Sequence, residues 1–360
     1  MSIPPKSAIA VFGAGSWGTA LAVLLARNGH GVTLWGHDAA HMARVARDRG
    51  NSAFLPGIAF PENLAVSDDL QSLASSVQCF LLVVPSHAFR AVLTALQPHL
   101  SRDAVVAWAT KGLDAGTGKL LSQVGDEILG VATASGIVSG PTFAKEVANG
   151  LPTAVTVASA DVAVAEAIAQ WLRNDRVRVY TSQDRIGVEL GGAVKNIMAI
   201  ATGISDGLGF GANARAALIT RGLAEMRRLG AAMGARPETF MGLAGLGDLV
   251  LTCTDDQSRN RRVGLALGKG RPLKLALADL RQVAEGVVTA REVHALAQRL
   301  KGQGVWVTEK FYEGFGHLEP VIALGAMWRW RMPVLQDTLD FFQTFGAFSS
   351  GTPRPVYTPE

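Results

Sequence analysis

Short apolar runs and amphipathic helical patterns alternate through the first half of the chain. Ala8–Phe12 and Gly31–Trp35 have the length of buried strands, and a helical pattern over Thr19–Asn28 separates them and ends at Gly29. The same pattern predicts strands over Val77–Val84, Ala104–Ala109 and Ile137–Val138, and a helix over Ala88–Leu96. Strands that alternate with helices in this way favour a parallel sheet covered by helices on both faces.

From about Arg185 the hydrophobic period becomes helical and little strand signal remains. Gly203–Gly211 predicts a glycine-rich break around Asp206, Ala214–Met233 predicts a long helix, and Gln282–Gly286 predicts a short polar turn. We therefore expect an α/β protein: a Rossmann-like doubly wound sheet over residues 1–184 and an all-α domain over residues 185–345. Residues 346–360, rich in Gly, Ser and Pro, predict a disordered or surface-draped tail.

Composition and charge limit the partners that the chain can have. With 360 residues, 48% of them hydrophobic, it can bury a large core and form two domains. The net charge is +4, and the basic residues are scattered except for a cluster at Arg259, Arg261 and Arg262. So small a cluster suits a small anion better than a nucleic acid, which needs a broad basic surface.

The two cysteines, Cys79 and Cys253, lie in apolar segments. This predicts buried thiols in a reducing compartment, with neither a disulfide framework nor a metal site. Glycines interrupt the apolar run near the N-terminus, which argues against a signal peptide. No apolar run reaches the roughly 18–20 residues needed to cross a bilayer. We therefore expect a cytoplasmic protein without a membrane span.

A glycine-rich turn follows the first predicted strand directly and opens the helix after it. The sequence GAGSWG places Gly13, Gly15 and Gly18 at the spacing G-x-G-x-x-G. Between a strand and a helix, this spacing permits a tight turn and lets a pyrophosphate approach the helix N-terminus. The turn therefore predicts dinucleotide binding, the alternative being a purely structural turn.

The end of the second predicted strand bears on the choice of cofactor. NAD-binding folds usually place an acid about twenty residues after the first glycine, to bind the ribose hydroxyls. Here that region reads Trp35-Gly36-His37-Asp38. His37, with Arg44 or Arg47 nearby, would suit a 2′-phosphate, whereas Asp38 would suit a ribose. Either NADPH or NADH is expected, and the pattern slightly favours NADP.

Lys195 is the single cation in an almost wholly apolar helical segment that continues over Ile197–Ile204. An unpaired buried ammonium is costly, so such a lysine normally has a partner or a lowered pKa. A lysine that titrates near neutrality can exchange a proton with a substrate hydroxyl. The alternative is a lysine that extends to the surface. Asp248, in a small apolar turn, is the candidate partner unless it only caps a helix.

Two further positions suggest an anion site. Lys111 follows the predicted strand Ala104–Ala109, and ligands of open parallel sheets bind at the carboxyl ends of strands. Ser258 is a plausible N-cap for a helix that begins with Arg259, where free N–H groups and a guanidinium would bind phosphate. The alternatives are a surface lysine and a solvated basic helix start.

Taken together, these segments make the chain resemble the bacterial type of NAD(P)-dependent glycerol-3-phosphate dehydrogenase. The matching segments run in order over roughly residues 8–300: GAGSWGTALA, LARNGH, LWGHD, WATKGL, SGPTFAKEVA, GGAVKNIMAIATGISDG, GLAGLGDLVLTCTDDQSRNRR and EGV. GGAVKN together with GDLVLTCT and SRNR is specific, whereas the glycine turn alone is not.

The resemblance implies reversible reduction of dihydroxyacetone phosphate to sn-glycerol 3-phosphate for phospholipid synthesis, with Lys195 as the proton donor or acceptor. It implies substrate contacts from Lys111, Gly140, Thr142, Lys195, Asp248, Ser258, Arg259 and Asn260. It implies cofactor contacts, beside the glycine turn, from Ser16, Trp17, His37, Lys111, Ala144, Arg259, Val283 and Glu285. A homodimer is possible. Neither a metal nor a nucleic acid is expected.

One segment departs from the family pattern. Lys301–Arg331 resembles an insertion or the product of an altered reading frame, and it holds three of the seven tryptophans. Every residue with an implied role precedes it. Two other functions stay open: a related hydroxyacid or 6-phosphogluconate-type dehydrogenase, which would lack the SRNR segment, and a non-catalytic NADP-sensing regulator, which would not need Lys195.

Overall fold

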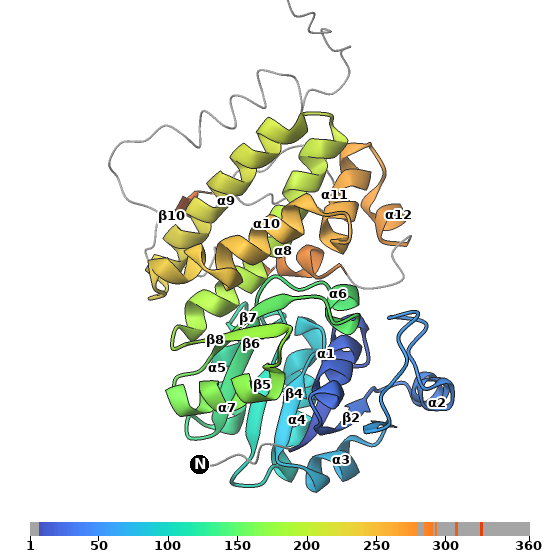
Figure 1. Ribbon diagram of the computed structural model, residues 1–360. Coiled ribbons are helices and arrows are strands. Elements are labelled where there is room, and N and C mark those ends of the chain that lie inside the picture. Colours follow the sequence, from blue (N-terminus) through green and yellow to red (C-terminus); the bar gives the residue numbers. More distant parts are fainter. Residues whose placement is uncertain (1–6, 279–283, 291, 294–306, 309–324, 327–360) are drawn as a thin grey trace, which may run out of the picture.

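The computed structural model describes residues 7–278, 284–290, 292–293, 307–308 and 325–326. An eight-stranded sheet with helices forms one part, and a layer of helices lies across one end of it (Figure 1). The strands are β1 (Ala8–Phe12), β2 (Gly31–Trp35), β3 (Leu64–Ser67), β4 (Cys79–Leu82), β5 (Val105–Trp108), β6 (Ala134–Ser139), β7 (Thr153–Ala158) and β8 (Val177–Ser182). This arrangement confirms the predicted α/β class, with a Rossmann-like sheet followed by helices.

The strand order is β3-β2-β1-β4-β5-β6-β7-β8. All neighbouring pairs are parallel except β6 and β7, which are antiparallel. The first six strands therefore have the order 3-2-1-4-5-6 of a doubly wound dinucleotide-binding sheet. The chain reverses its direction of progress between β1 and β4, and ligands bind at the carboxyl ends of the strands beside such a reversal.

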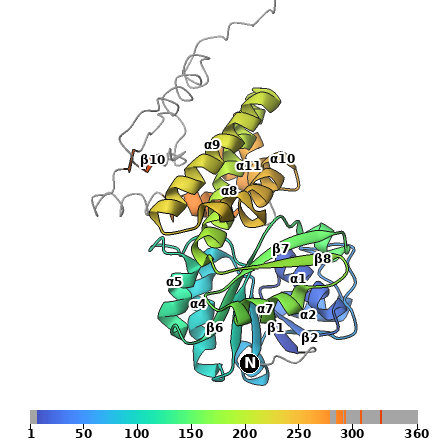
Figure 2. The ribbon, with the colours of Figure 1, turned by 60° about the vertical axis from the view of Figure 1, so that its left-hand side comes forward.

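Helices cover both faces of the sheet, which explains why its strands are apolar throughout. Ile9 and Val11 of β1 pack in one core with α1, α2 and α7, whereas Ala10 and Phe12 pack in another with α3, α4 and α5. Figure 2 shows the sheet between these layers. The helices are α1 (Ser16–Arg27), α2 (Ala39–Asp48), α3 (Leu70–Ser76), α4 (Ser86–Leu96), the short η1 (Gln97–His99), α5 (Leu121–Leu129), α6 (Ala144–Ala148) and α7 (Val162–Leu172).

The helical part begins with α8 (Arg185–Gly207), just after β8. Asp184 caps this helix by accepting a hydrogen bond from Gly187 N at 2.9 Å, and it also accepts one from Thr239 Oγ1 at 2.6 Å. The remaining elements are α9 (Gly211–Ala232), η2 (Pro237–Met241), η3 (Leu243–Gly247), α10 (Asp248–Thr254), α11 (Arg259–Gly268), α12 (Leu273–Ala278) and the paired strands β9 (Val307–Thr308) and β10 (Gly325–Ala326).

The predicted glycine-rich break at Gly203–Gly211 is wrong for its first half, because α8 continues to Gly207. Glycine is needed at Gly203 because α11 packs closely against α8. A Cβ on Gly203 would lie 2.3 Å from the carbonyl oxygen of Arg261. A Cβ on Gly264 of α11 would likewise lie 2.1 Å from the carbonyl oxygen of Ile200. These glycines therefore permit helix contact and do not break the chain.

Other predictions fall on short or undescribed segments. The polar turn predicted at Gln282–Gly286 is wrong at its end, since residues 285–290 are helical, and residues 282–283 lie outside the described part. The tail at 346–360 and all of Lys301–Arg331 except β9 and β10 also lie outside it. β3, β7 and β8 were not predicted, because their residues alternate between buried and exposed or are partly exposed.

Candidate active site

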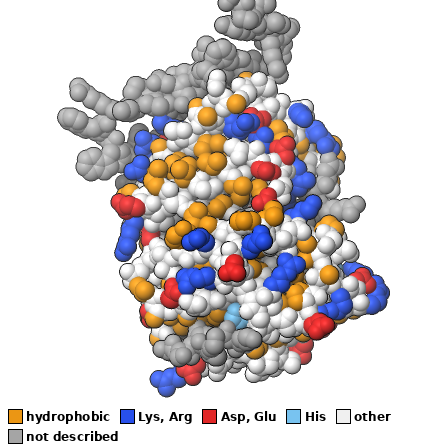
Figure 3. Space-filling model, in the orientation of Figure 1, with side chains coloured by type: hydrophobic (Ala, Val, Ile, Leu, Met, Phe, Trp, Pro, Cys, Tyr) orange, Lys and Arg blue, Asp and Glu red, His pale blue; other side chains and the backbone are white. Residues whose placement is uncertain are grey.

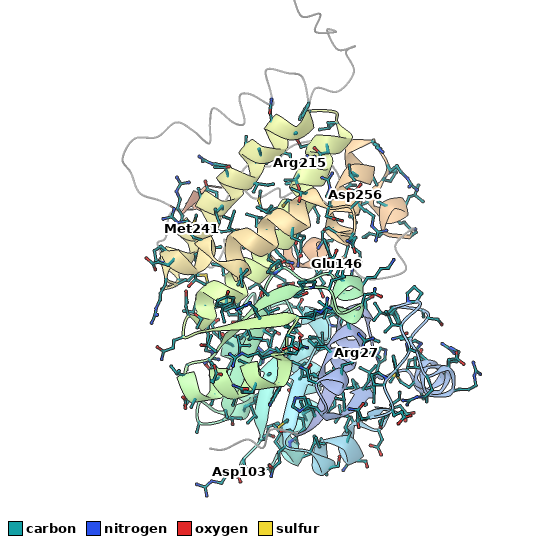
Figure 4. All side chains as sticks on the ribbon, in the orientation of Figure 1. Arg27, Asp103, Glu146, Arg215, Met241 and Asp256 are labelled. Carbon is teal, nitrogen blue, oxygen red and sulfur yellow. The ribbon has the colours of Figure 1, made fainter. Side chains whose placement is uncertain are left out.

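A cavity of about 540 Å³ lies where the carboxyl ends of the strands meet the helical part. On the sheet side it is lined by residues that follow β1, β4, β5 and β6, among them Trp17, Val84, Lys111 and Thr142. At the junction, α6 carries Glu146, labelled in Figure 4, which accepts a hydrogen bond from Gln257 Nε2 at 2.9 Å. The cavity lining on the helical side is Lys195, Asn196, Thr252, Gln257, Ser258, Arg259, Asn260, Arg262 and Glu285.

The glycine turn has the geometry that a dinucleotide requires. Gly13 has a φ of 124°, and a Cβ on Gly18 would lie 1.8 Å from the carbonyl oxygen of Gly13. No heavy atom lies within 4 Å of a Cβ built on Gly15, so the space in front of this backbone is open. Gly15 precedes the first residue of α1. The open space at a helix N-terminus fits a pyrophosphate.

A single buried carboxylate joins the two lysines that the sequence singled out. Asp248 is fully buried, with Oδ1 at 2.5 Å from Lys195 Nζ and Oδ2 at 2.7 Å from Lys111 Nζ. Lys195 also donates to Thr252 Oγ1 at 3.1 Å, and Lys111 donates to the carbonyl oxygen of Gly140 at 3.1 Å. Asp248 is the first residue of α10, and its side chain binds ammonium groups instead of capping a helix.

The pKa of Lys195 is lowered to about 8, mainly because burial disfavours the charged ammonium. Asp248 opposes this shift by stabilising the ammonium, the positive charge of Lys111 adds to it, and the value of about 8 includes all three effects. The Lys195 side chain is 8% exposed and ion-paired, so it does not extend to the surface. An amine with this pKa interconverts between its charged and neutral forms near neutral pH, as a proton donor and acceptor must.

The start of α11 supplies an anion-binding surface to the same cavity. Ser258 is the N-cap, as predicted, and accepts from Arg261 N at 3.2 Å. Asn260 connects this helix to α8, because its Nδ2 donates to Asn196 Oδ1 at 3.0 Å. Its Oδ1 accepts from Gly286 N at 2.9 Å. Arg259 and Asn260 therefore line the cavity on a helix start that is fixed against the helix of Lys195.

The structure gathers most of the candidate residues around this cavity, but not all of them. Gly140 and Asp248 border the lining through their contacts with Lys111. His37 is exposed beyond β2 and is not part of the lining. Glu285 lies in the lining, and burial raises the pKa of its carboxyl although the charge of Arg259 opposes this. Val283 lies outside the described residues.

Thr252, Asn196 and Phe54 are among the contributors that were not predicted from the sequence. Thr252 lies one helical turn after Asp248, and Asn196 directly follows Lys195, so spacing alone would have revealed these two. Phe54 belongs to a loop that closes over the glycine turn, where Ser16 Oγ donates to its carbonyl oxygen at 2.6 Å. Nothing in the local sequence of that loop indicates this position.

The described residues contain no group of three or more His, Cys, Asp or Glu side chains that could hold a metal ion. Within the same residues, no helix combines the length and apolar character that crossing a membrane requires. A doubly wound sheet, a glycine turn open to a pyrophosphate and a buried lysine that faces the same cavity define a nicotinamide-dependent dehydrogenase.

Comparison with known proteins specifies the family. Residues 8–165 match the N-terminal part of NAD-dependent glycerol-3-phosphate dehydrogenase, and residues 184–323 match its C-terminal part. Glycerol-3-phosphate dehydrogenase [NAD(P)+] of Yersinia pestis (strain Pestoides F) is 58% identical over 314 residues, which cover 87% of this chain and 92% of that protein. The chain therefore belongs to the NAD-dependent glycerol-3-phosphate dehydrogenase family.

Solved structures agree with this assignment. The crystal structure of glycerol-3-phosphate dehydrogenase from Coxiella burnetii has a TM-score of 0.81 and 50% identity, and the match covers 83% of this chain and 91% of that one. Glycerol-3-phosphate dehydrogenase from Saccharomyces cerevisiae has a TM-score of 0.72 and 26% identity, with 93% and 99% covered. D-mandelate dehydrogenase, at 16% identity and a TM-score of 0.55, shares the fold alone.

Proposed function

We propose that this chain is an oxidoreductase that reduces dihydroxyacetone phosphate to sn-glycerol 3-phosphate with NADPH or NADH, reversibly, and so supplies phospholipid synthesis. One observation carries the proposal: a buried lysine of lowered pKa, held by Asp248, shares a cavity with the basic N-terminus of α11. The proteins from Yersinia pestis and Coxiella burnetii named above are both called glycerol-3-phosphate dehydrogenase. Hydroxyacid and 6-phosphogluconate-type dehydrogenases are not favoured.

The cofactor has a fitting place between the glycine turn and the helical part. Its pyrophosphate fits the open space beside Gly15, at the N-terminus of α1. Gly13 and Gly18 belong to the same turn. The remaining proposed contacts are Ser16, Trp17, His37, Lys111, Ala144, Arg259, Val283 and Glu285. When bound, the nicotinamide supplies the hydride in reduction and accepts it in oxidation.

The substrate phosphate is assigned to the N-terminus of α11. Ser258, Arg259 and Asn260 combine a guanidinium fork, polar side chains and a helix N-terminus, all of which favour a dianion. Lys111, Gly140 and Thr142 lie across the cavity from this helix and are assigned to the triose. The charged groups of the site thus suit a small phosphorylated ketone.

Lys195 is the proton donor and acceptor. In reduction its ammonium Nζ donates a proton to the carbonyl oxygen as that oxygen becomes a hydroxyl, and in oxidation the neutral amine accepts the proton. Asp248 and Thr252 hold Nζ in place through the contacts at 2.5 Å and 3.1 Å. Lys111, on the other oxygen of the same carboxylate, lowers the pKa of Lys195 by charge repulsion.

A substrate panel tests this assignment against the alternatives. We expect kcat/KM for dihydroxyacetone phosphate to exceed that for 6-phosphogluconate or a 2-hydroxy acid, in the appropriate direction, by on the order of a thousandfold, because the binding groups are placed for a phosphotriose. A higher value for either alternative substrate would move the chain to a related dehydrogenase. No turnover of any substrate by a folded protein that binds NADPH would favour a regulator.

Assembly and location complete the proposal. Figure 3 shows apolar side chains gathered over the helical part of the molecule, and Met241 and Val250 are 54% and 40% exposed there. A homodimer formed through this part would cover that apolar surface, and sedimentation equilibrium would test it.

A cytoplasmic location fits the two free, buried cysteines, Cys79 and Cys253.

A further inference from the structure

Arg261 stands next to the proposed phosphate site without taking part in it. Arg259, Asn260 and Arg262 line the cavity, whereas Arg261 does not. Its side chain is buried, at 7% exposure, and points to the interior of the helical part. Burying a guanidinium costs free energy unless its N–H groups donate hydrogen bonds, so the acceptors around Arg261 determine where this side chain is held.

Three segments of the chain supply the hydrogen-bond acceptors of Arg261. Each segment carries, or lies next in sequence to, a residue of the candidate active site. Arg261 Nη1 lies 2.5 Å from Asp206 Oδ2 of α8, the helix that carries Lys195. The same nitrogen donates to the carbonyl oxygen of Cys253 at 3.3 Å, directly after Thr252. Arg261 Nε lies 2.9 Å from Asp256 Oδ1, in the loop that leads to α11. One side chain thus connects α8, the end of α10 and this loop.

The close contact between α8 and α11 makes the connection possible. Gly203 and Gly264 bring the two backbones together, and the carbonyl oxygen of Arg261 itself faces Gly203. Asp206 lies one turn beyond Gly203 on α8. The planar fork of arginine matches several acceptors at fixed angles, which the single ammonium of lysine does not.

We propose that Arg261, held by Asp206, is a positioning residue that fixes the start of α11, and with it the Arg259 guanidinium, relative to Lys195. This inference rests on the proposed function. A shift of about 1 Å in a binding group can cost up to about a hundredfold in catalytic efficiency, so the position of α11 affects kcat/KM for a phosphorylated substrate. The affected step is recognition of the phosphate, since Lys195 and Asp248 do not contact Arg261.

The test compares a phosphorylated and an unphosphorylated substrate in the variant Arg261→Lys, which keeps the charge. We expect KM for dihydroxyacetone phosphate to rise at least tenfold, with kcat changed less than about threefold. For dihydroxyacetone, which has no phosphate to misplace, kcat/KM should stay within about twofold of the wild type. Equal losses on both substrates, or no loss on either, would overturn the inference.

Arg215→Lys is the matched control. Arg215 of α9, labelled in Figure 4, lies 2.7 Å from the same oxygen of Asp206 but forms no hydrogen bond with α11 among the described residues. We expect its KM for dihydroxyacetone phosphate to stay within about twofold of the wild type. A rise equal to that of Arg261→Lys would mean that loss of any ion pair to Asp206 loosens the helical part, and the positioning role would fail.

A binding measurement separates failure of this inference from failure of the proposed function. Inorganic phosphate, titrated calorimetrically into both proteins, probes the start of α11 without turnover. We expect Arg261→Lys to bind phosphate at least tenfold more weakly than wild type, whatever the true substrate is. Unchanged phosphate affinity would overturn the positioning role. Absence of dihydroxyacetone phosphate turnover in the wild type would instead overturn the proposed function.

Discussion

At the scale of single residues, the site depends on one carboxylate that serves two lysines. Asp248 bears one negative charge, whereas Lys111 and Lys195 together bear two positive charges when both are protonated. Repulsion between the lysines adds to the effect of burial, and the pKa of Lys195 falls to about 8 as a result. Lys195 therefore loses its proton nearer to neutral pH than a lysine in water does.

Replacement of Lys195 tests its role in proton transfer. Lys195→Ala should lower kcat at least a hundredfold, the usual effect of removing a general acid–base group. The affinity for the cofactor should barely change, as measured by fluorescence titration. Lys269→Ala removes the exposed lysine that follows the end of α11 and should leave kcat as in the wild type. Near-normal turnover in Lys195→Ala would end the assignment.

The pH dependence of kcat should differ between the two directions. Reduction needs Lys195 protonated, so its kcat should be constant at low pH and fall as the pH rises through about 8. Oxidation needs the neutral amine, so its kcat should rise with pH and level off above about 8. Steady-state measurement of kcat in each direction across this pH range shows whether it falls or rises. The same pH dependence in both directions would contradict proton exchange at Lys195.

Arginine at position 259 should matter for its shape as well as its charge. Arg259→Lys keeps a cation at the start of α11 but loses the two-pronged geometry that matches a phosphate. We expect KM for dihydroxyacetone phosphate to rise at least tenfold, measured by steady-state kinetics at saturating cofactor. An unchanged KM would place the phosphate elsewhere in the cavity.

At the scale of elements, the contact of α8 with α11 sets the distance between the proposed proton donor and the proposed phosphate site. Glycines at four positions, Gly203, Gly207, Gly264 and Gly268, leave no room for a Cβ on the facing surfaces. The structural role of these glycines could not be predicted from the sequence, because glycines at this spacing are compatible both with an interrupted helix and with close helix packing. Only the partner helix decides between the two.

A single methyl group tests that contact. Gly264→Ala puts a Cβ 2.1 Å from the carbonyl oxygen of Ile200, so the helices must separate, at a cost of about 1–3 kcal/mol in the free energy of unfolding. Helix propensity alone would favour alanine, so a loss of stability identifies the steric cause. Gly31→Ala, where a Cβ meets nothing within 4 Å, is the control for chemical denaturation and should change stability by less than about 0.5 kcal/mol. Equal stability of Gly264→Ala and the wild type would contradict the close packing.

The corner between β2 and α2 bears on cofactor choice. Asp38 already caps α2, since its carboxylate accepts from His41 N at 2.9 Å, while His37 is exposed beside it. With the acid engaged in this way, NADPH should be used at least as well as NADH. The ratio of the two kcat/KM values at saturating substrate measures this. A strong preference for NADH would mean that Asp38 binds the ribose.

At the scale of the whole molecule, the predictable features were those that local chemistry determines. The glycine turn, the alternating first half and the N-cap at Ser258 follow from neighbouring residues, and the structure has them where expected. Asp248 binds Lys111, which lies 137 residues earlier in the chain, and Lys195, which lies 53 residues earlier. Only the folded chain reveals that the two lysines share this carboxylate. The partly exposed strands β3 and β8 were missed because edge strands lack the continuous apolar run of central ones.

The most direct test of the whole account is a product assay on the purified full chain. The chain is incubated with NADPH and dihydroxyacetone phosphate, oxidation is followed by nicotinamide absorbance, and the product is identified by chromatography. We expect one sn-glycerol 3-phosphate for each NADPH oxidised, and an at least hundredfold slower reaction with Lys195→Ala. Oxidation without that product, or equal rates for the two proteins, would contradict it.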